Sequence, residues 1–218
     1  DSGRVQYTEQ VKGYEETFTP HEFARGIQID RKLIDDNRIP EALDAAEALG
    51  DAAFRMREKA GANVFINAFS AATSETLDDY GTDAVGSDAV ALCSTAHPRH
   101  AGDSGTTNTN EGTLSLTKAN VSTTRQLMAE MVDPNGDLIN VMPDELLVPV
   151  ELEDSALEIV KSALDPASAN NAINPQAGRF QVITWHYLTD ANAWWLMDSG
   201  YRRRALRWYD RIPLEFAR

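Results

Sequence analysis

The opening of the chain, residues 1–30, alternates apolar and polar positions around a break at Lys12–Gly13. Alternation with a period of two is typical of extended chain. The apolar members are Val5, Tyr7, Val11, Phe23, Ile27 and Ile29. Two long strands without a third element are marginal in water, so this segment has little core of its own. We therefore expect an extended ribbon that lies on another surface.

A helical pattern follows from Pro40 to about Ala71, where apolar residues recur at spacings of three and four. One stripe contains Ala42, Ala45, Leu49, Ala52, Met56 and Ala60, and the stripe beside it contains Leu43, Ala46, Ala53, Val64 and Ala68. Pro40 suits a first helical turn. Gly50 and Gly61 each cost about 1 kcal/mol relative to Ala, but they allow another backbone to approach closely. We predict one long helix of roughly 48 Å that is covered on two sides.

The rest of the chain predicts shorter elements. In order, these are a strand over Asp88–Ala96, a polar loop over Arg99–Gly112, a helix over Thr117–Val132, a turn at Asp133–Gly136, a strand over Leu146–Val150, a helix over Leu152–Leu164, a loop over Pro166–Pro175, and strand-like stretches over Arg179–Tyr187, Ala193–Met197 and Ala205–Tyr209. Leu127, Met128 and Met131 are expected to face inward. Helices mixed with strands in this order predict an α+β fold.

The 218-residue chain has 20 Lys and Arg against 34 Asp and Glu, so its net charge is −14, and its pI is about 4.6. This balance excludes a nucleic-acid-binding domain of the usual basic kind. Hydrophobic residues make up 42% of the chain, which excludes disorder of the whole chain. No apolar run approaches the ~20 residues that span a bilayer, so we expect no membrane association. Cys93 is the one cysteine and cannot form a disulfide within the chain.

Charge is distributed unevenly along the chain. Residues 130–158 contain nine acids and no Lys or Arg. The segment from Ser199 onward reverses this balance with Arg202, Arg203, Arg204, Arg207, Arg211 and Arg218 against Asp210 and Glu215. Such complementary surfaces meet either within one molecule or between neighbouring molecules, and two separate solvated faces are the third interpretation.

Gly102–Gly105 (GDSG) resembles the nucleophile loop of chymotrypsin-like proteases, in which backbone N–H groups beside a serine stabilise an oxyanion. The surrounding sequence contradicts this interpretation. Thr106 stands where that loop has another glycine, and the alternation of an all-β barrel is missing. His97 and His100 are also too close in sequence to match the order of that family. A serine hydrolase using Ser104 is therefore only a distant alternative to a flexible polar loop.

Cys93, His97 and His100 are side chains that can bind a metal ion. Pro98 breaks the helix that would align two histidines, and neither a further cysteine nor a spaced carboxylate completes a tetrahedral set. A buried thiol and two loop histidines are the better interpretation. A nucleophilic Cys–His pair is equally weak, because nothing indicates a lowered pKa for the thiol.

Aromatic residues are dense near the end of the chain. The members are Trp185, His186, Tyr187, Trp194, Trp195, Tyr201, Trp208 and Tyr209. Beside Arg202–Arg204 they could act as a base-stacking surface, but the acidic total favours a core. The phosphate-binding GxxxxGK and dinucleotide-binding GxGxxG motifs are absent. We expect no catalytic, cofactor-binding or metal-binding residue.

Six stretches, which together span nearly the whole chain, carry a family resemblance. They are Gly13–Phe18; Phe23–Gly26 through Leu33–Asn37; Ala62–Phe65 with Asn67–Phe69; Ala91–Pro98; His186–Asp190 with Ala193–Trp195; and Leu206–Tyr209 with Pro213–Phe216. Taken in order, they resemble the major capsid (major head) proteins of tailed bacteriophages, in particular the Mu-like major head subunit group.

The resemblance implies the capsid fold named after phage Hong Kong ninety-seven, and it divides the chain into units. Residues 1–32 are then the extended hairpin (E-loop) and its return strand. Residues 33–113 are the peripheral domain, with the spine helix 40–71 and the polar loop 99–112. Residues 114–200 are the axial domain, and 201–218 return to the peripheral domain. Relatives have an N-terminal arm and a further C-terminal strand, so we expect the last unit to be incomplete.

The implied function is self-assembly into an icosahedral shell around packaged double-stranded DNA, which is enclosed without sequence-specific binding. The implied partners are copies of the chain in hexamers and pentamers, with portal, scaffold, head protease and decoration proteins, and the shell is assembled in the host cytoplasm. The candidate intersubunit contacts are Lys12, Tyr14, Phe18, Arg202, Arg203 and Arg204. Lys12 is also the candidate for the Lys–Asn cross-link of some relatives. An encapsulin-like cellular compartment shell is the alternative.

Overall fold

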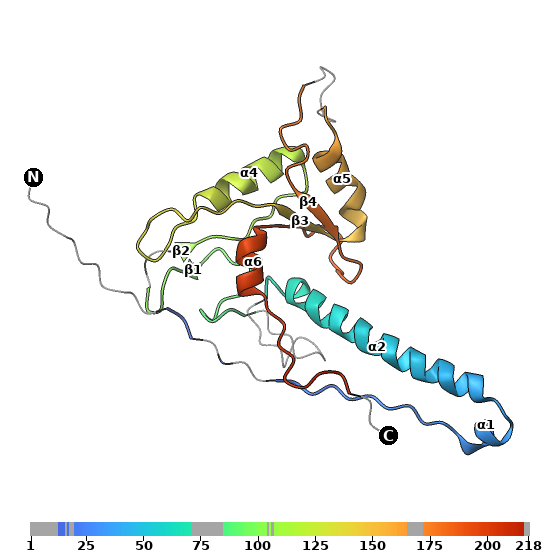
Figure 1. The fold of residues 1–218 in the computed structure, drawn as a ribbon. Helices are drawn as coiled ribbons and strands as arrows, with labels where there is room; N and C mark the ends of the chain where they lie inside the picture. Colours follow the sequence, from blue (N-terminus) through green and yellow to red (C-terminus); the bar gives the residue numbers. More distant parts are fainter. Residues whose placement is uncertain are drawn as a thin grey trace, which may run out of the picture.

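A computed structural model describes residues 13–15, 17, 20–70, 85–103, 105, 107–164 and 172–215. These residues form a mixture of helices and short strands, which confirms the α+β class. In Figure 1 a small sheet and its covering helices make a body, from which one long helix projects. The described part of the chain contains no helix that is long and apolar enough to cross a membrane.

The centre of the body is a three-stranded sheet with the order β4-β3-β5. The middle strand β3 (Glu145–Val148) runs parallel to β4 (Gln181–Thr184) and antiparallel to β5 (Trp195–Met197). Every residue of β3 is buried, and the apolar run Leu146–Val148 is typical of a central strand, whereas its first residue is the buried carboxylate Glu145. The prediction of these three strands is confirmed, with shorter bounds. Pro149 ends β3 because proline has no backbone N–H to donate.

Two helices cover this sheet. Helix α4 (Lys118–Ala129) begins at Thr117, whose side chain accepts a hydrogen bond from the backbone N–H of Asn120. Helix α5 (Glu153–Lys161) follows a turn of 3₁₀ helix, η1 (Val150–Leu152). Their shared core with the sheet contains Val121, Leu146, Val148, Ala156, Ile159, Val160 and Phe180. The inward position of Leu127 was predicted wrongly, since that residue is 51% exposed and Val121 is buried instead.

Helix α1 (Arg31–Asp35) and helix α2 (Ile39–Ile66) form the projecting part. Proline stands in the first turn of α2 as predicted, but the helix ends at Ile66 rather than near Ala71. The prediction that this helix is covered on two sides is wrong for the single chain. Only the last turns of α2 are buried, and Leu43 and Phe54 are 61% and 66% exposed.

Two predicted strands are also wrong. Over residues 88–96 the chain bends tightly, because Ala89 has φ +61° and the Asp88 side chain accepts a hydrogen bond from the N–H of Val90. Strands form only just beyond, where β1 (His97–Pro98) pairs antiparallel with β2 (Thr107–Asn108) inside the expected polar loop. Residues 205–209 end helix α6 (Ser199–Ala205) and continue as coil. Asp198 caps α6 by accepting hydrogen bonds from two backbone N–H groups.

Candidate functional site

Among the residues considered for catalysis and metal binding, Cys93 and His97 serve local structure. Ser104 lies outside the described residues. Burial raises the pKa of the Cys93 thiol to about 11, so the thiol keeps its proton at neutral pH and is a poor nucleophile. Within the described ranges, no group of three or more His, Cys, Asp and Glu side chains could hold a metal ion.

His97 joins two loops. Its Nδ1 lies 2.6 Å from an Asp88 carboxylate oxygen, and its Nε2 lies 3.1 Å from Oδ1 of Asn110. The Asn110 amide is itself fixed, since its Nδ2 donates to the carbonyl of Leu92 and its Oδ1 accepts from the N–H of Ser94. The imidazole therefore holds the two loops together and has a structural role.

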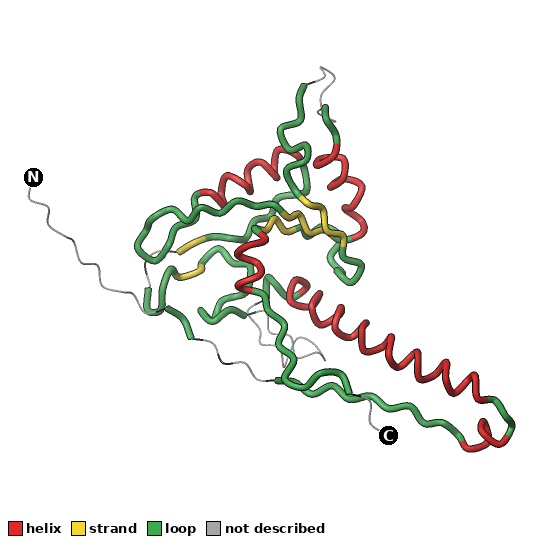
Figure 2. Tube along the Cα trace, viewed as in Figure 1, coloured by secondary structure: helices red, strands yellow, loops and turns green. Residues whose placement is uncertain are grey.

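The ribbon has little support from its own chain. Residues 20–30 are exposed throughout and form no strand, and Figure 2 draws the described part of this segment as loop. Phe23, Ile27 and Ile29 are each about 40% exposed. The hydroxyl of Tyr14 donates to the carbonyl of Pro98 at 3.3 Å, which attaches the ribbon to β1. The candidates Lys12 and Phe18 lie outside the described residues.

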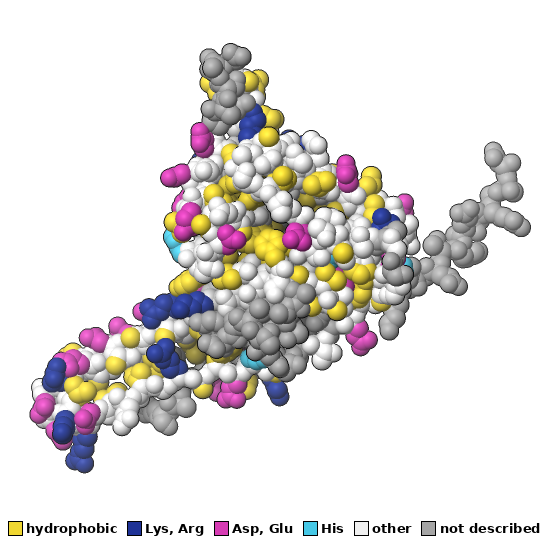
Figure 3. Space-filling model, turned by 180° about the vertical axis from the view of Figure 1, so that it is seen from behind, with side chains coloured by type: hydrophobic (Ala, Val, Ile, Leu, Met, Phe, Trp, Pro, Cys, Tyr) yellow, Lys and Arg dark blue, Asp and Glu magenta, His cyan; other side chains and the backbone are white. Residues whose placement is uncertain are grey.

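The projecting helix α2 exposes a second apolar surface. At 100° per residue, Ile39, Leu43 and Phe54 lie within one helical face, and all three are more than half exposed. Figure 3 shows hydrophobic side chains along this projection among charged ones. Further along α2, the C-terminal segment covers the helix, because Arg57 forms an ion pair with Asp210 at 2.9 Å and lies 5.9 Å from the centre of the Trp208 ring.

The acidic and basic segments meet inside the molecule at one point. Arg202 of α6 donates two hydrogen bonds to the carboxylate of Glu145, at 2.5 and 2.9 Å. Beside this pair, the Ser199 hydroxyl donates to Asp144 at 2.6 Å, and this bond is the main cause of the lowered pKa of Asp144. Arg203 and Arg204 remain exposed, and Arg204 lies over the Tyr201 ring. Among the described residues, Arg202 is the one of these three arginines that forms an ion pair within the chain.

The dense aromatic residues divide between core and surface. Trp195 is buried with Phe65 and Cys93, whereas Trp208 and Tyr209 are 51% and 62% exposed. The expectation of a core therefore holds for part of the cluster only.

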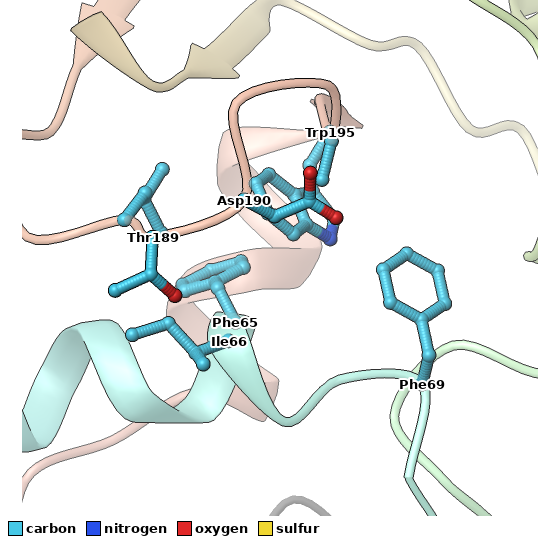
Figure 4. Close-up of a pocket in the computed structure, with 8 residues that line it drawn as sticks. Phe65, Ile66, Phe69, Thr189, Asp190 and Trp195 are labelled. Carbon is cyan, nitrogen blue, oxygen red and sulfur yellow. The ribbon is translucent and has the colours of Figure 1, made fainter.

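A small pocket lies where the end of α2 meets the loop between β4 and β5. Figure 4 labels Phe65, Ile66, Phe69, Thr189, Asp190 and Trp195 in its lining. Sequence reasoning missed this pocket, because its two halves are more than a hundred residues apart along the chain. The only signal was that both halves fall in stretches that carry the family resemblance.

Comparison with known proteins matches the chain to a protein family. A family model described as phage capsid protein matches residues 14–218. No curated protein matches the chain. A solved structure described as the capsid of bacteriophage JBD30 decorated with minor capsid protein trimers matches with a TM-score of 0.30 and 23% identity. That match covers 35% of this chain and 26% of the other, so this chain spans about a quarter of the length of the matched one.

The structural likeness is too low to carry an argument, but the family match covers almost the whole chain. It agrees with the apolar side chains that residues 20–30 and α2 leave exposed. The chain therefore belongs to the phage capsid protein family and is a structural protein of the virion capsid.

Proposed function

We propose that copies of this chain self-assemble into an icosahedral shell around packaged double-stranded DNA. The observation that carries the proposal is the pair of apolar surfaces, on the ribbon and on α2, that the described chain leaves exposed. Contiguous exposed apolar surface on a soluble protein marks an interaction site. In a closed shell each copy repeats the same contacts, so modest individual affinities are enough.

The proposed arrangement is that of the Hong Kong ninety-seven capsid fold. The ribbon acts as the E-loop and lies on a neighbouring subunit, where Phe23, Ile27 and Ile29 lose their exposure. Helix α2 acts as the spine of the peripheral domain, residues 114–200 as the axial domain, and residues 201–218 return to the periphery. The absence of strand pairing in residues 20–30 supports this role for the ribbon, since an unpaired segment is available to a partner.

The net charge of −14 supports enclosure of DNA without binding to it. An acidic inner surface repels phosphate, which permits dense packing without adhesion. Portal, scaffold, head protease and decoration proteins are the proposed partners of the shell, and the host cytoplasm is the proposed place of assembly.

Among the candidate contacts, Arg203 and Arg204 keep exposed guanidinium groups for neighbouring copies. Reversal of both charges to Glu is expected to lower assembly yield and to change its dependence on salt, because exposed ion pairs are screened by salt. If the assembly yield and its salt dependence are unchanged, these two arginines make no contact between subunits.

Lys12 is proposed as a cross-linking residue. Mature particles run on a denaturing gel should then give a ladder of linked subunits, which Lys12→Arg abolishes. A single band at the monomer mass of 24.0 kDa would contradict the cross-link but leave the shell intact.

The central test is electron microscopy of the purified full chain, combined with light scattering after size-exclusion chromatography. Closed particles are expected, and Leu43→Asp should prevent them, because that side chain lies on the exposed face of α2. Asp44→Asn, at the adjacent exposed position, is the matched control. A stable monomer near 24 kDa under all assembly conditions would overturn the proposal.

A further inference from the structure

Three aromatic rings and a carboxylate share the small pocket at the end of α2 (Figure 4). Phe65 meets Trp195 edge to face with ring centroids 5.5 Å apart, and Phe69 stacks on Trp195 at 6.3 Å with 26° between the ring planes. Trp195 is 8% exposed and Phe69 is 47% exposed, so the rings form a wall from the core to the surface. Asp190 is exposed at the same pocket, and one of its oxygens accepts the N–H of Asn192 at 2.9 Å.

We propose that this pocket binds an arginine side chain of a neighbouring copy of the chain, an inference that rests on the proposed assembly. The faces of aromatic rings carry negative potential and attract cations. A guanidinium group is planar, so it stacks on Phe69 or Trp195 while it pairs with the Asp190 carboxylate, which a lysine ammonium group does less well. The arginine would also bring an N–H donor to a carboxylate that one backbone bond leaves with free acceptor capacity.

The space enclosed by the pocket is small, since its empty volume of about 210 Å³ includes open solvent. It offers room for the end of one side chain at most, which excludes a larger ligand.

The pocket has no cation nearby in the sequence. None of its lining residues is Lys or Arg. The sequence that follows Phe69 and Ser70, residues 71–84, contains four acids and no base. The lining therefore supplies no cation of its own, and in a lattice of identical subunits a second copy is the available source.

The C-terminal segment offers two arginines for this role. Arg207 and Arg211 are exposed, and neither forms an ion pair with another described residue. Arg57 and Arg202, by contrast, already pair with carboxylates in their own chain. Trp208, Tyr209 and Ile212 are exposed in the same segment, as expected of a surface that a neighbour covers. We therefore assign the occupant to Arg207 or Arg211 of the neighbouring copy.

The first experiment tests the pocket without assembly. N-acetyl-arginine amide is titrated into the unassembled full chain, and the indole N–H resonance of Trp195, identified with Trp195→Phe, is followed by NMR. A saturable shift is expected, with affinity reduced about threefold or more by Asp190→Asn. N-acetyl-leucine amide is the uncharged probe. An equal response to the leucine amide, no response to either, or no effect of Asp190→Asn would each overturn the cation site.

The second experiment tests the occupant. Arg207→Ala and Arg211→Ala are each combined with Asp190→Asn, and particle yield is measured by light scattering, with exposed Arg179→Ala as control. One of the two arginine variants should lower the yield and should add no further loss to Asp190→Asn. If the loss of yield in each arginine variant simply adds to the loss in Asp190→Asn, the assignment of the occupant to this segment is overturned. If the arginine amide binds but the native chain forms no particles, the proposed self-assembly is contradicted. The cation site in the pocket is then still supported by the binding.

Discussion

At the residue scale, the pair of Glu145 and Arg202 fixes α6 to the first residue of the central strand β3. The Glu145 side chain is 6% exposed and that of Arg202 is 31% exposed. Arg202→Ala leaves a buried carboxylate without its partner, which we expect to lower the free energy of unfolding by about 1–3 kcal/mol, since partial exposure of the arginine reduces the full penalty. Urea unfolding measures the change.

Arg203→Ala is the matched control, because that side chain is exposed on the same helix, and its effect should stay within about 0.5 kcal/mol. Glu145→Gln with Arg202→Met should recover part of the loss, because no buried charge remains. Equal stability of Arg202→Ala and Arg203→Ala would show that the pair does not hold α6.

Asp144 gives a pH dependence at the same place. The Ser199 hydroxyl and backbone N–H stabilise its ionised form and lower its pKa below the ordinary 3.8. A lowered folded-state pKa means that the stabilisation is fully present above the unfolded-state pKa and is lost as the pH falls below it. Wild type should therefore lose more Tm than Asp144→Asn between pH 5 and acidic pH below about 3. Parallel Tm curves for the two proteins would contradict this role of Asp144.

At the element scale, two glycines of α2 have different surroundings. A Cβ added at Gly50 meets nothing within 4 Å, whereas one added at Gly61 lies 3.1 Å from the Trp185 ring. Gly50→Ala should therefore raise the stability of the free subunit by up to about 1 kcal/mol. Gly61→Ala is expected to be less stable than Gly50→Ala, because Trp185 must shift, and the hydrogen bond from its indole N–H to Glu58 must adjust. Thermal unfolding of unassembled protein compares the two.

The same variants report on assembly. If a neighbouring backbone packs closely on Gly50 in the shell, Gly50→Ala stabilises the subunit but lowers particle yield. A yield that rises together with stability would show that this part of α2 makes no close contact between copies.

The elements that the sequence predicts well are those whose signals are local. The helix predicted from Thr117 begins at Lys118 with Thr117 as its cap, the turn predicted at Asp133–Gly136 has Gly136 at φ +91°, and the apolar run from Leu146 forms most of β3. The two wrong strands have different origins. Over residues 88–96 the Asp88 side chain bonds to nearby backbone and favours a bend, whereas residues 205–209 follow a helix that Asp198 caps at its start and leave it as coil.

The candidate site was predictable only in part. An extended ribbon follows from its alternation, but the meeting of Phe65 with Trp195 depends on the antiparallel pairing of β5 with β3 and on where α2 packs, which no local pattern contains. Likewise, the charge map predicted that the acidic and basic segments are complementary, whereas the choice of Glu145 as the partner of Arg202 depends on where α6 packs.

At the scale of the whole molecule, the body holds its own core while the ribbon and the first half of α2 do not. The buried residues concentrate on the sheet, on α4 and α5, and on the end of α2. An isolated subunit should therefore behave as a stable body with weakly protected extensions. In the proposed shell, we expect the extensions to become better protected where neighbouring copies cover them.

The ribbon tests this division most directly. Phe23→Ser, Ile27→Ser and Ile29→Ser combined should leave the body folded, because all three side chains are already about 40% exposed. Hydrogen exchange of β3 amides should match wild type. Particle yield should fall by roughly tenfold or more, since a closed shell repeats one weakened contact at every copy. Glu22→Ser with Gln28→Ser, at exposed polar positions of the same ribbon, is the control. Loss of β3 protection in the triple variant would mean that the ribbon belongs to its own subunit's core, and the lattice would then need a different contact.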